Sequence, residues 1–161
     1  MQSGVVSAMP AADLERYLHD HIPLSRALGV RVVHLGPELV RLSAPLAPNI
    51  NHRRTAFGGS VASLAILAGW SWLLVRLADR SPVPRLVIQE ETVEYLAPID
   101  AEFEALCPAP AETAWRRFVR ALDGRGRGRL ELTTEVKSEG SLAARFRGLY
   151  VAIAGPAADG A

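Results

Sequence analysis

The chain has 161 residues, a formal net charge of +1 at pH 7 and a single cysteine, Cys107. This length is enough for one domain with a substantial core, and the near-neutral charge gives no general attraction to nucleic acid or to an anionic membrane. A single cysteine excludes an internal disulfide and an all-cysteine metal site, as is usual in a reducing compartment. We expect a cytoplasmic protein with no nucleic-acid partner.

The predicted elements follow the order helix, two strands, long helix, two strands, short helix, two strands. The first helix covers residues 13–28, where Pro23 interrupts it and Gly29 ends it. Segments rich in β-branched and aromatic residues predict strands at residues 30–35, 39–45, 86–96, 101–106, 130–138 and 142–153. The short helix is expected at residues 112–122, and a loop of alternating glycine and arginine at 124–129.

The long helix, residues 59–78, is nearly continuous in apolar residues and contains one charge, Arg76. Its length is close to that of a membrane span, but it contains three serines and no second span accompanies it. A helix that is apolar on almost every side also suits the centre of a soluble fold. We predict a buried helix and no membrane partner, in a domain of residues 13–154 with flexible ends at 1–12 and 155–161.

One apolar helix beside about six mostly antiparallel strands has a simple physical solution. The sheet curls around the helix and buries it on its concave face, which gives an α+β fold. Exposed strand edges then favour pairing with a second copy of the chain.

Four short segments carry a family resemblance: PNINH at 48–52, TAFGGS at 55–60, Gly-Trp at 69–70 and Tyr-Leu-Ala-Pro at 95–98. Together with the order of elements, they resemble the hot-dog fold, a curved antiparallel sheet wrapped around a long helix. More narrowly, they resemble the thioesterase family known from the C-terminal domain of YiiD. The resemblance covers residues 20–153. It implies a homodimer or dimer of dimers that hydrolyses acyl thioesters of coenzyme A or acyl carrier protein, with no cofactor or metal.

A glycine pair at the start of a helix suits thioester chemistry. Gly58 and Gly59 let a carbonyl approach the backbone, where free N–H groups and the helix dipole stabilise an oxyanion. Alternatively, the glycines serve only close packing of helix and sheet. Asn51 falls where phenylacetyl-CoA-type hot-dog thioesterases carry an asparagine, so it orients the thioester or a water; the alternative is an Asx turn that shapes the loop.

The sequence departs from those thioesterases at two positions. They carry a histidine before the glycine pair and a helix carboxylate two turns later, where this chain has Phe57 and Ile66. The usual acid is therefore missing, and another group must activate water. Ser63 should share the helix face of Ile66, although a serine there is commonly a small residue bonded to its own backbone.

The strand at residues 86–96 offers a base. Strict alternation places Glu91 with Val87, Gln89, Val93 and Tyr95 on the more apolar face, predicted to lie against the helix. A half-buried Glu91 there, across a dimer interface from the partner's helix, would have a raised pKa and act as general base. A β-bulge would exchange the faces and favour Glu90 instead, and an exposed acidic edge that discourages aggregation is the other interpretation.

Substrate contacts are expected from two basic segments and the residues beside the glycine pair. Arginine suits the phosphates of coenzyme A or an acidic carrier protein, and solvated basic turns are the alternative. The predicted contacts are His52, Arg53, Arg54, Thr55, Phe57, Trp70, Arg125, Arg127 and Arg129, with Trp72 as a further wall of an acyl tunnel or simply core.

A loop histidine such as His52 would suggest a hot-dog dehydratase, but the helix acid of that chemistry is absent, so hydrolysis ranks above dehydration. The four histidines, at positions 19, 21, 34 and 52, show no metal-ligand spacing. Two classes stay open: an acyl-thioesterase, and a non-catalytic binder of acyl thioesters.

Overall fold

The computed structural model describes residues 9–155. The helices are α1 (Ala11–His21), α2 (Pro23–Leu28), α3 (Gly58–Leu77) and α4 (Glu112–Arg125), with a 3-10 turn, η1 (Ala47–Asn49). The strands are β1 (Arg31–Leu35), β2 (Leu39–Ala44), β3 (Arg85–Tyr95), β4 (Phe103–Pro108), β5 (Arg127–Ser138) and β6 (Ser141–Ile153). Most of the two ends predicted to be flexible, namely residues 1–8 and 156–161, lies outside the described residues.

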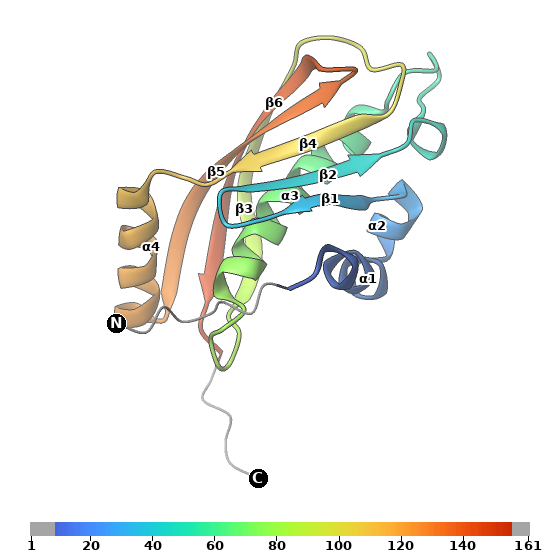
Figure 1. Ribbon diagram of the computed structural model, residues 1–161. Helices are drawn as coiled ribbons and strands as arrows, with labels where there is room; N and C mark the ends of the chain where they lie inside the picture. Colours follow the sequence, from blue (N-terminus) through green and yellow to red (C-terminus); the bar gives the residue numbers. More distant parts are fainter. Residues whose placement is uncertain (1–8, 156–161) are drawn as a thin grey trace.

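The six strands form one sheet in the order β1-β2-β4-β5-β6-β3, and every neighbouring pair is antiparallel. The sheet curls around α3, which lies along its concave side, and α1 and α2 pack next to β1 (Figure 1). This is the α+β hot-dog architecture predicted from the sequence, and the prediction is confirmed. The long helix joins β2 to β3, which lies at the opposite edge of the sheet from β1.

Helix α3 supplies the centre of the core. Leu64, Ala65, Ala68 and Leu73 have no exposed surface, and burial of one leucine contributes about 1.5–3 kcal/mol. Among the described residues, α3 alone is long and apolar enough to cross a membrane, and more than half of its most apolar window is buried in the fold. Strand residues complete the core, including Cys107 on β4, which is fully buried.

Three segments differ from the sequence prediction. The first helix divides at Ile22, because Pro23 has no N–H to continue α1 and instead starts α2 at its first position. The prediction of a loop at residues 124–129 was wrong. Helix α4 continues to Arg125 and ends at Gly126, which has a φ of 68°, and β5 begins at the next residue. Strand β4 also lies about two residues later than predicted.

Helix α3 and β6 approach closely at Gly69. The Tyr150 hydroxyl donates a 2.8 Å hydrogen bond to the carbonyl oxygen of Ile66, one helical turn before Gly69. A Cβ on Gly69 would clash with the oxygen and ring of Tyr150, and both residues are buried. The missing side chain at Gly69 therefore allows β6 to pack directly on the helix.

We expect Gly69→Ala to destabilise the fold by about 1–3 kcal/mol, because the buried Tyr150 ring has no room to move. The matched control is Gly124→Ala on α4, where a Cβ would contact nothing within 4 Å. It should be neutral or stabilise the fold by up to about 1 kcal/mol. Urea unfolding midpoints at constant slope measure both changes; a Gly69→Ala midpoint equal to that of the native chain would contradict the packing argument.

Candidate active site at the amino end of the central helix

The loop before α3 is a tight turn that presents its basic residues to solvent. Ile50 and Ala56 form an isolated antiparallel bridge, and the Asn51 N–H donates to the carbonyl oxygen of Thr55 at 2.8 Å. Arg54 lies in the left-handed region, with a φ of 64°. His52, Arg53 and Arg54 are exposed at the tip of this turn.

Asn51 shapes this turn with its side chain. Its Oδ1 accepts hydrogen bonds from the Arg53 N–H at 2.8 Å and the Thr55 N–H at 3.2 Å, and its Nδ2 donates to Thr55 Oγ1 at 3.0 Å. These bonds form the Asx turn that the sequence analysis left as the alternative. In this conformation both ends of the Asn51 amide are engaged within the turn.

Asn49 is a positioning residue that sequence reasoning missed. Its side chain is 2% exposed, and its Nδ2 donates to the carbonyl oxygens of Leu28 at 2.9 Å and Pro45 at 2.7 Å. Its own carbonyl oxygen accepts the Phe57 N–H at 2.7 Å. Asn49 thus joins the end of α2, the loop and the start of α3.

The first turn of α3 leaves two N–H groups free. The N–H groups of Ser60 and Val61 donate to the Phe57 carbonyl oxygen at 2.9 and 3.1 Å. Within residues 9–155, the N–H groups of Gly58 and Gly59 donate to no backbone or side-chain acceptor. Two adjacent free donors at the positive end of a 20-residue helix can stabilise a developing negative charge.

The two glycines also leave room for neighbouring aromatic rings. A Cβ on Gly59 would clash with the ring of Phe57, and one on Gly58 would lie 3.2 Å from the Tyr95 hydroxyl oxygen. The Phe57 side chain is 59% exposed, so it can move more easily than a core residue. The packing role and the proposed oxyanion role are therefore compatible.

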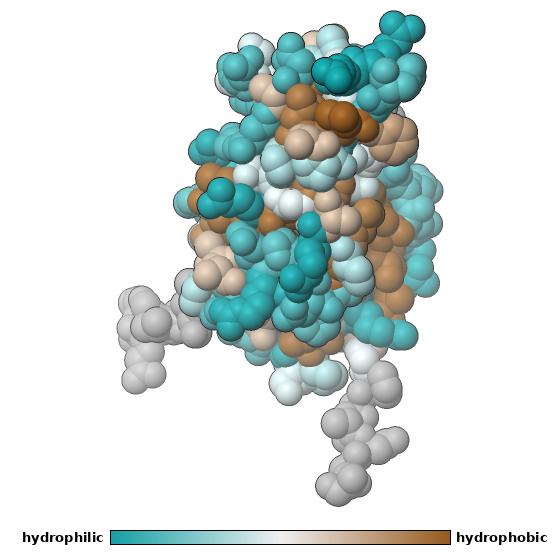
Figure 2. Space-filling model, turned by 90° about the vertical axis from the view of Figure 1, so that its right-hand side faces the viewer, coloured by the Kyte–Doolittle hydropathy of each residue, from teal (hydrophilic) through white to brown (hydrophobic). Residues whose placement is uncertain are grey.

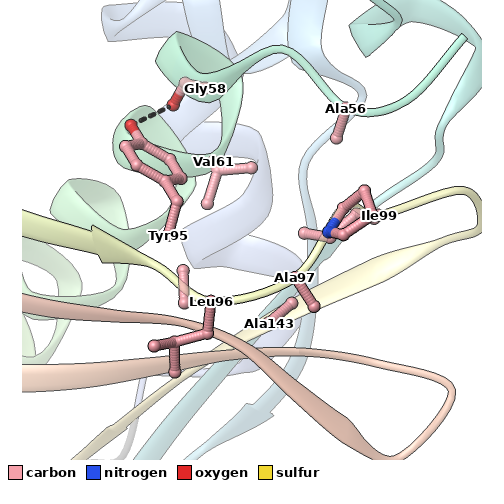
Figure 3. Close-up of a pocket in the computed structure, with 10 residues that line it drawn as sticks. Ala56, Gly58, Val61, Tyr95, Leu96, Ala97, Ile99 and Ala143 are labelled. Carbon is pink, nitrogen blue, oxygen red and sulfur yellow. Dashed lines mark hydrogen bonds between the residues drawn. The ribbon is translucent and has the colours of Figure 1, made fainter. Parts of the chain in front are cut away.

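A cavity of about 380 Å³ opens beside Gly58. Figure 3 shows the Tyr95 hydroxyl directed at Gly58 and small apolar side chains around the space. The lining residues come from the loop before α3, the start of α3, the end of β3 with the segment after it, and β6; among them are Gly58, Val61, Tyr95, Ala97, Ile99 and Ala143. Such a mainly apolar hollow suits a hydrocarbon chain.

Strand β3 contains a bulge, so the predicted faces of this strand are wrong for the residues before it. The register with β6 shifts between Ile88 and Glu90, so Leu86 and Ile88, rather than Val87, pack on the core. Beyond the bulge Glu91 is paired with Gly148, in the same alternation as the core residue Val93, and so lies on the helix side. Glu91 therefore faces the helix as predicted, and Glu90 lies on the opposite face of the strand.

Two tyrosines indicate where the Glu91 carboxylate lies. Burial raises the pKa of Tyr95, and the negative charge of Glu91 raises it further. Burial also raises the pKa of Tyr150, with smaller contributions from Cys107 and Glu91. The Glu91 charge therefore acts on two hydroxyls that donate hydrogen bonds to the α3 backbone, although in the single chain Glu91 is exposed rather than half-buried as expected.

Ser63 and the two tryptophans have structural contacts. The Ser63 hydroxyl donates to the Gly59 carbonyl oxygen at 2.7 Å, within its own helix. Trp72 is buried and donates to the Pro37 carbonyl oxygen at 2.9 Å, so the core interpretation holds for it. Trp70 is half-buried, stacks on Tyr17 and donates to the Leu86 carbonyl oxygen at 3.3 Å.

The two basic segments lie at opposite ends of the folded molecule. The turn with Arg53 and Arg54 is near the amino end of α3, whereas the end of α4 and the start of β5 lie at the far end (Figure 1). Arg125 is on the helix, Arg127 is on the strand, and Arg129 donates to Gln89 at 3.2 Å. One chain therefore does not bring both segments to one substrate.

Two of the four histidines make local contacts. His19 Nε2 is 2.8 Å from the carbonyl oxygen of Val30, and His21 Nδ1 is 2.9 Å from that of Tyr17. In the part of the chain that the structure describes, no group of three or more His, Cys, Asp or Glu side chains is placed to hold a metal ion.

The chain belongs to the family described as "Putative thioesterase (yiiD_Cterm)", whose model matches residues 11–154. This confirms the resemblance found in the sequence and identifies the chain as a member of a hot-dog thioesterase family.

Solved structures agree with this assignment. A protein of unknown function from Chlorobaculum tepidum is 25% identical, with a TM-score of 0.83 over 92% of this chain and 99% of that one. A putative thioesterase from Shewanella oneidensis is 27% identical, with a TM-score of 0.78 over 89% and 96%. A probable thioesterase from Pseudomonas aeruginosa is 26% identical, with a TM-score of 0.78 over 91% and 97%.

The two asparagines of the loop should respond differently to mutation. Asn49→Ala removes the donor from two carbonyl groups, and we expect it to destabilise the fold by about 1–3 kcal/mol. Asn51→Ala loosens an exposed turn and should cost less than about 1 kcal/mol. Thermal and urea unfolding measure both; equal losses would show that the Asn49 bonds do not hold the loop.

Proposed function

We propose that the protein hydrolyses acyl thioesters of coenzyme A or acyl carrier protein at the amino end of α3. The observation that carries this proposal is the pair of free N–H groups of Gly58 and Gly59, together with a mainly apolar cavity of about 380 Å³ that Gly58 lines. Membership of a thioesterase family supports the same reaction.

In this proposal the thioester carbonyl oxygen points at the two glycine N–H groups and the acyl chain enters the cavity. Water attacks the carbonyl carbon, and the N–H groups stabilise the oxyanion that forms. Loss of one such donor typically costs about 10²–10³ in rate. The oxyanion then collapses, the C–S bond breaks, and the products are a carboxylic acid and a thiol.

Glu91 is the base that we assign to this reaction. Its carboxylate takes a proton from the attacking water and returns it to the leaving sulfur, so the proton count balances. Its place on the helix side of β3, near Tyr95 and Tyr150, supports the role. Asn51 and Ser63 are weaker candidates, because their polar atoms bond within the turn and within the helix.

The carrier is anionic, and the exposed His52, Arg53 and Arg54 are suitably placed to contact it. They lie in the turn that leads directly into the proposed oxyanion hole. Arg125 and Arg127 could contact the same carrier only in an oligomer, because within one chain they lie at the far end (Figure 1).

Purified protein incubated with acyl-CoAs of increasing chain length, and with the same acyl groups on acyl carrier protein, tests the activity. Release of free thiol at a rate proportional to enzyme supports hydrolysis. Binding of the thioesters without turnover would support the non-catalytic alternative, and neither binding nor turnover would reject the site.

Glu91→Gln preserves size but removes the base, so we expect kcat to fall about 10²–10⁴-fold. Glu90→Gln is the matched control, because it is the adjacent residue on the opposite face of β3. It should remain within about twofold of native turnover. The reverse pattern would assign the base to Glu90, and two active variants would exclude a carboxylate of this strand.

We also propose a homodimer that forms along β3. This 11-residue strand lies at one edge of the sheet and pairs with β6 on one side. Exposed apolar side chains lie on β3 and near the amino end of α3, including Val87, Tyr95, Leu96, Ile50 and Phe57, and further apolar patches are visible in Figure 2. Such surfaces commonly mark an interface, and pairing would bring the Glu91 region close to a second chain.

Light scattering at micromolar concentration should give about twice the chain mass of 17.4 kDa, or a multiple of the dimer. Val87→Glu should shift the protein toward monomer, because it places a charge at the proposed interface. Val33→Glu is the matched control at the opposite edge: Val33 is 46% exposed on β1, and Val87 is 48% exposed on β3. A monomeric native protein would overturn the proposal.

A further inference from the structure

Tyr95 connects the end of β3 to the first turn of α3. Its hydroxyl donates a 2.8 Å hydrogen bond to the Gly58 carbonyl oxygen, and its ring lines the cavity (Figure 3). The hydroxyl comes so close that a Cβ on Gly58 would lie only 3.2 Å from it. The Tyr95 hydroxyl thus contacts the backbone at the point where the proposed chemistry takes place.

The Gly58 carbonyl and the Gly59 N–H belong to one planar peptide group. A hydrogen bond that the oxygen accepts polarises the group, so the N–H on its other side becomes a stronger donor. The same bond restricts rotation of the peptide plane. The Tyr95 hydroxyl therefore acts on the Gly59 N–H without touching it.

The first turn of α3 needs such support. Phe57, at the N-cap, provides no side-chain hydrogen bond to the helix. Two consecutive glycines follow, and glycine has the widest range of backbone conformations. A contact from another element therefore adds to the bonds of the helix itself in fixing the direction of the Gly59 N–H.

We propose that Tyr95 is a positioning residue for thioester hydrolysis, which holds and polarises the Gly58–Gly59 peptide so that the Gly59 N–H points at the oxyanion. The inference rests on the proposed function. It assigns Tyr95 no contact with the reacting atoms.

Strand β3 would then position both the proposed base and, through Tyr95, the oxyanion donor. Glu91 and Tyr95 lie on the same face of the strand, beyond its bulge. Burial and the nearby Glu91 charge raise the pKa of Tyr95 above its usual value of 10, so the phenol keeps its proton at neutral pH and remains a donor. The separation between base and oxyanion donor is thus fixed by one strand and one hydroxyl.

Tyr95→Phe removes the hydroxyl and keeps the ring. Loss of a neutral hydrogen bond is worth about 0.5–1.5 kcal/mol, so we expect kcat to fall by about two- to tenfold while KM stays nearly constant. Tyr17→Phe on α1 is the control for removal of a tyrosine hydroxyl elsewhere and should keep native kcat. Native kcat in Tyr95→Phe would overturn the inference.

Two kinds of inhibitor separate positioning from general support of the fold. A trifluoromethyl ketone analogue of an acyl-CoA forms an oxyanion-like adduct, whereas an S-alkyl-CoA thioether has no carbonyl group. Tyr95→Phe should weaken binding of the ketone by about the factor lost in kcat and leave the thioether unchanged. Equal loss for both inhibitors would show a structural role only.

The amide signal of Gly59 tests the coupling in the absence of substrate. Tyr95→Phe should shift the Gly59 ¹⁵N and ¹H resonances more than those of residues elsewhere in α3, and an unshifted Gly59 signal would overturn the inference whatever the activity. If the native protein hydrolyses no thioester but the Gly59 signal shifts, the proposed function fails and the contact stands.

Gly58→Ala provides a second variant, because its methyl group would press on the Tyr95 hydroxyl. If both changes act through one hydrogen bond, the double variant should lose no more kcat than the more severe single variant. Additive losses would overturn the shared mechanism.

Discussion

A helix that is apolar on almost every side must be enclosed, and this constraint governs the rest of the molecule. Twelve of the 20 residues of α3 are buried, which requires a sheet that curves around it instead of lying flat. The curved sheet brings the end of β3 next to the amino end of the helix, where Tyr95 meets Gly58. The free N–H groups, the apolar cavity and the basic turn all gather there, because that end of the helix remains accessible.

The sequence was a good guide wherever local pattern decides structure. Segments rich in β-branched and aromatic residues located the strands, and the charge-poor segment located the central helix. The glycine- and arginine-rich segment near residue 125 was wrongly predicted to be a loop, because its composition is typical of loops. Buried Phe118 and Leu122 instead hold α4 in place, and the left-handed Gly126 lets β5 start immediately. Packing overrode composition at this point.

Site residues were harder to predict, because tertiary contacts distinguish them. Asn49 and Asn51 are two positions apart, and nothing local shows that one is buried against the end of α2 while the other forms an exposed turn. The bulge at Gln89 has no glycine to mark it, so strict alternation wrongly placed Val87 toward the helix. Glu91 was assigned to the helix side despite that error, because it and Val93 both follow the bulge.

The burial of Cys107 has a practical consequence for chemistry in solution. Burial raises the pKa of this thiol to about 11. The thiolate is the form that reacts with disulfide reagents and oxidants, and at neutral pH this side chain is almost entirely protonated as well as shielded. We therefore expect aromatic disulfide reagents to leave the native chain unlabelled, so that any thiol they detect in the proposed reaction would come from the released carrier.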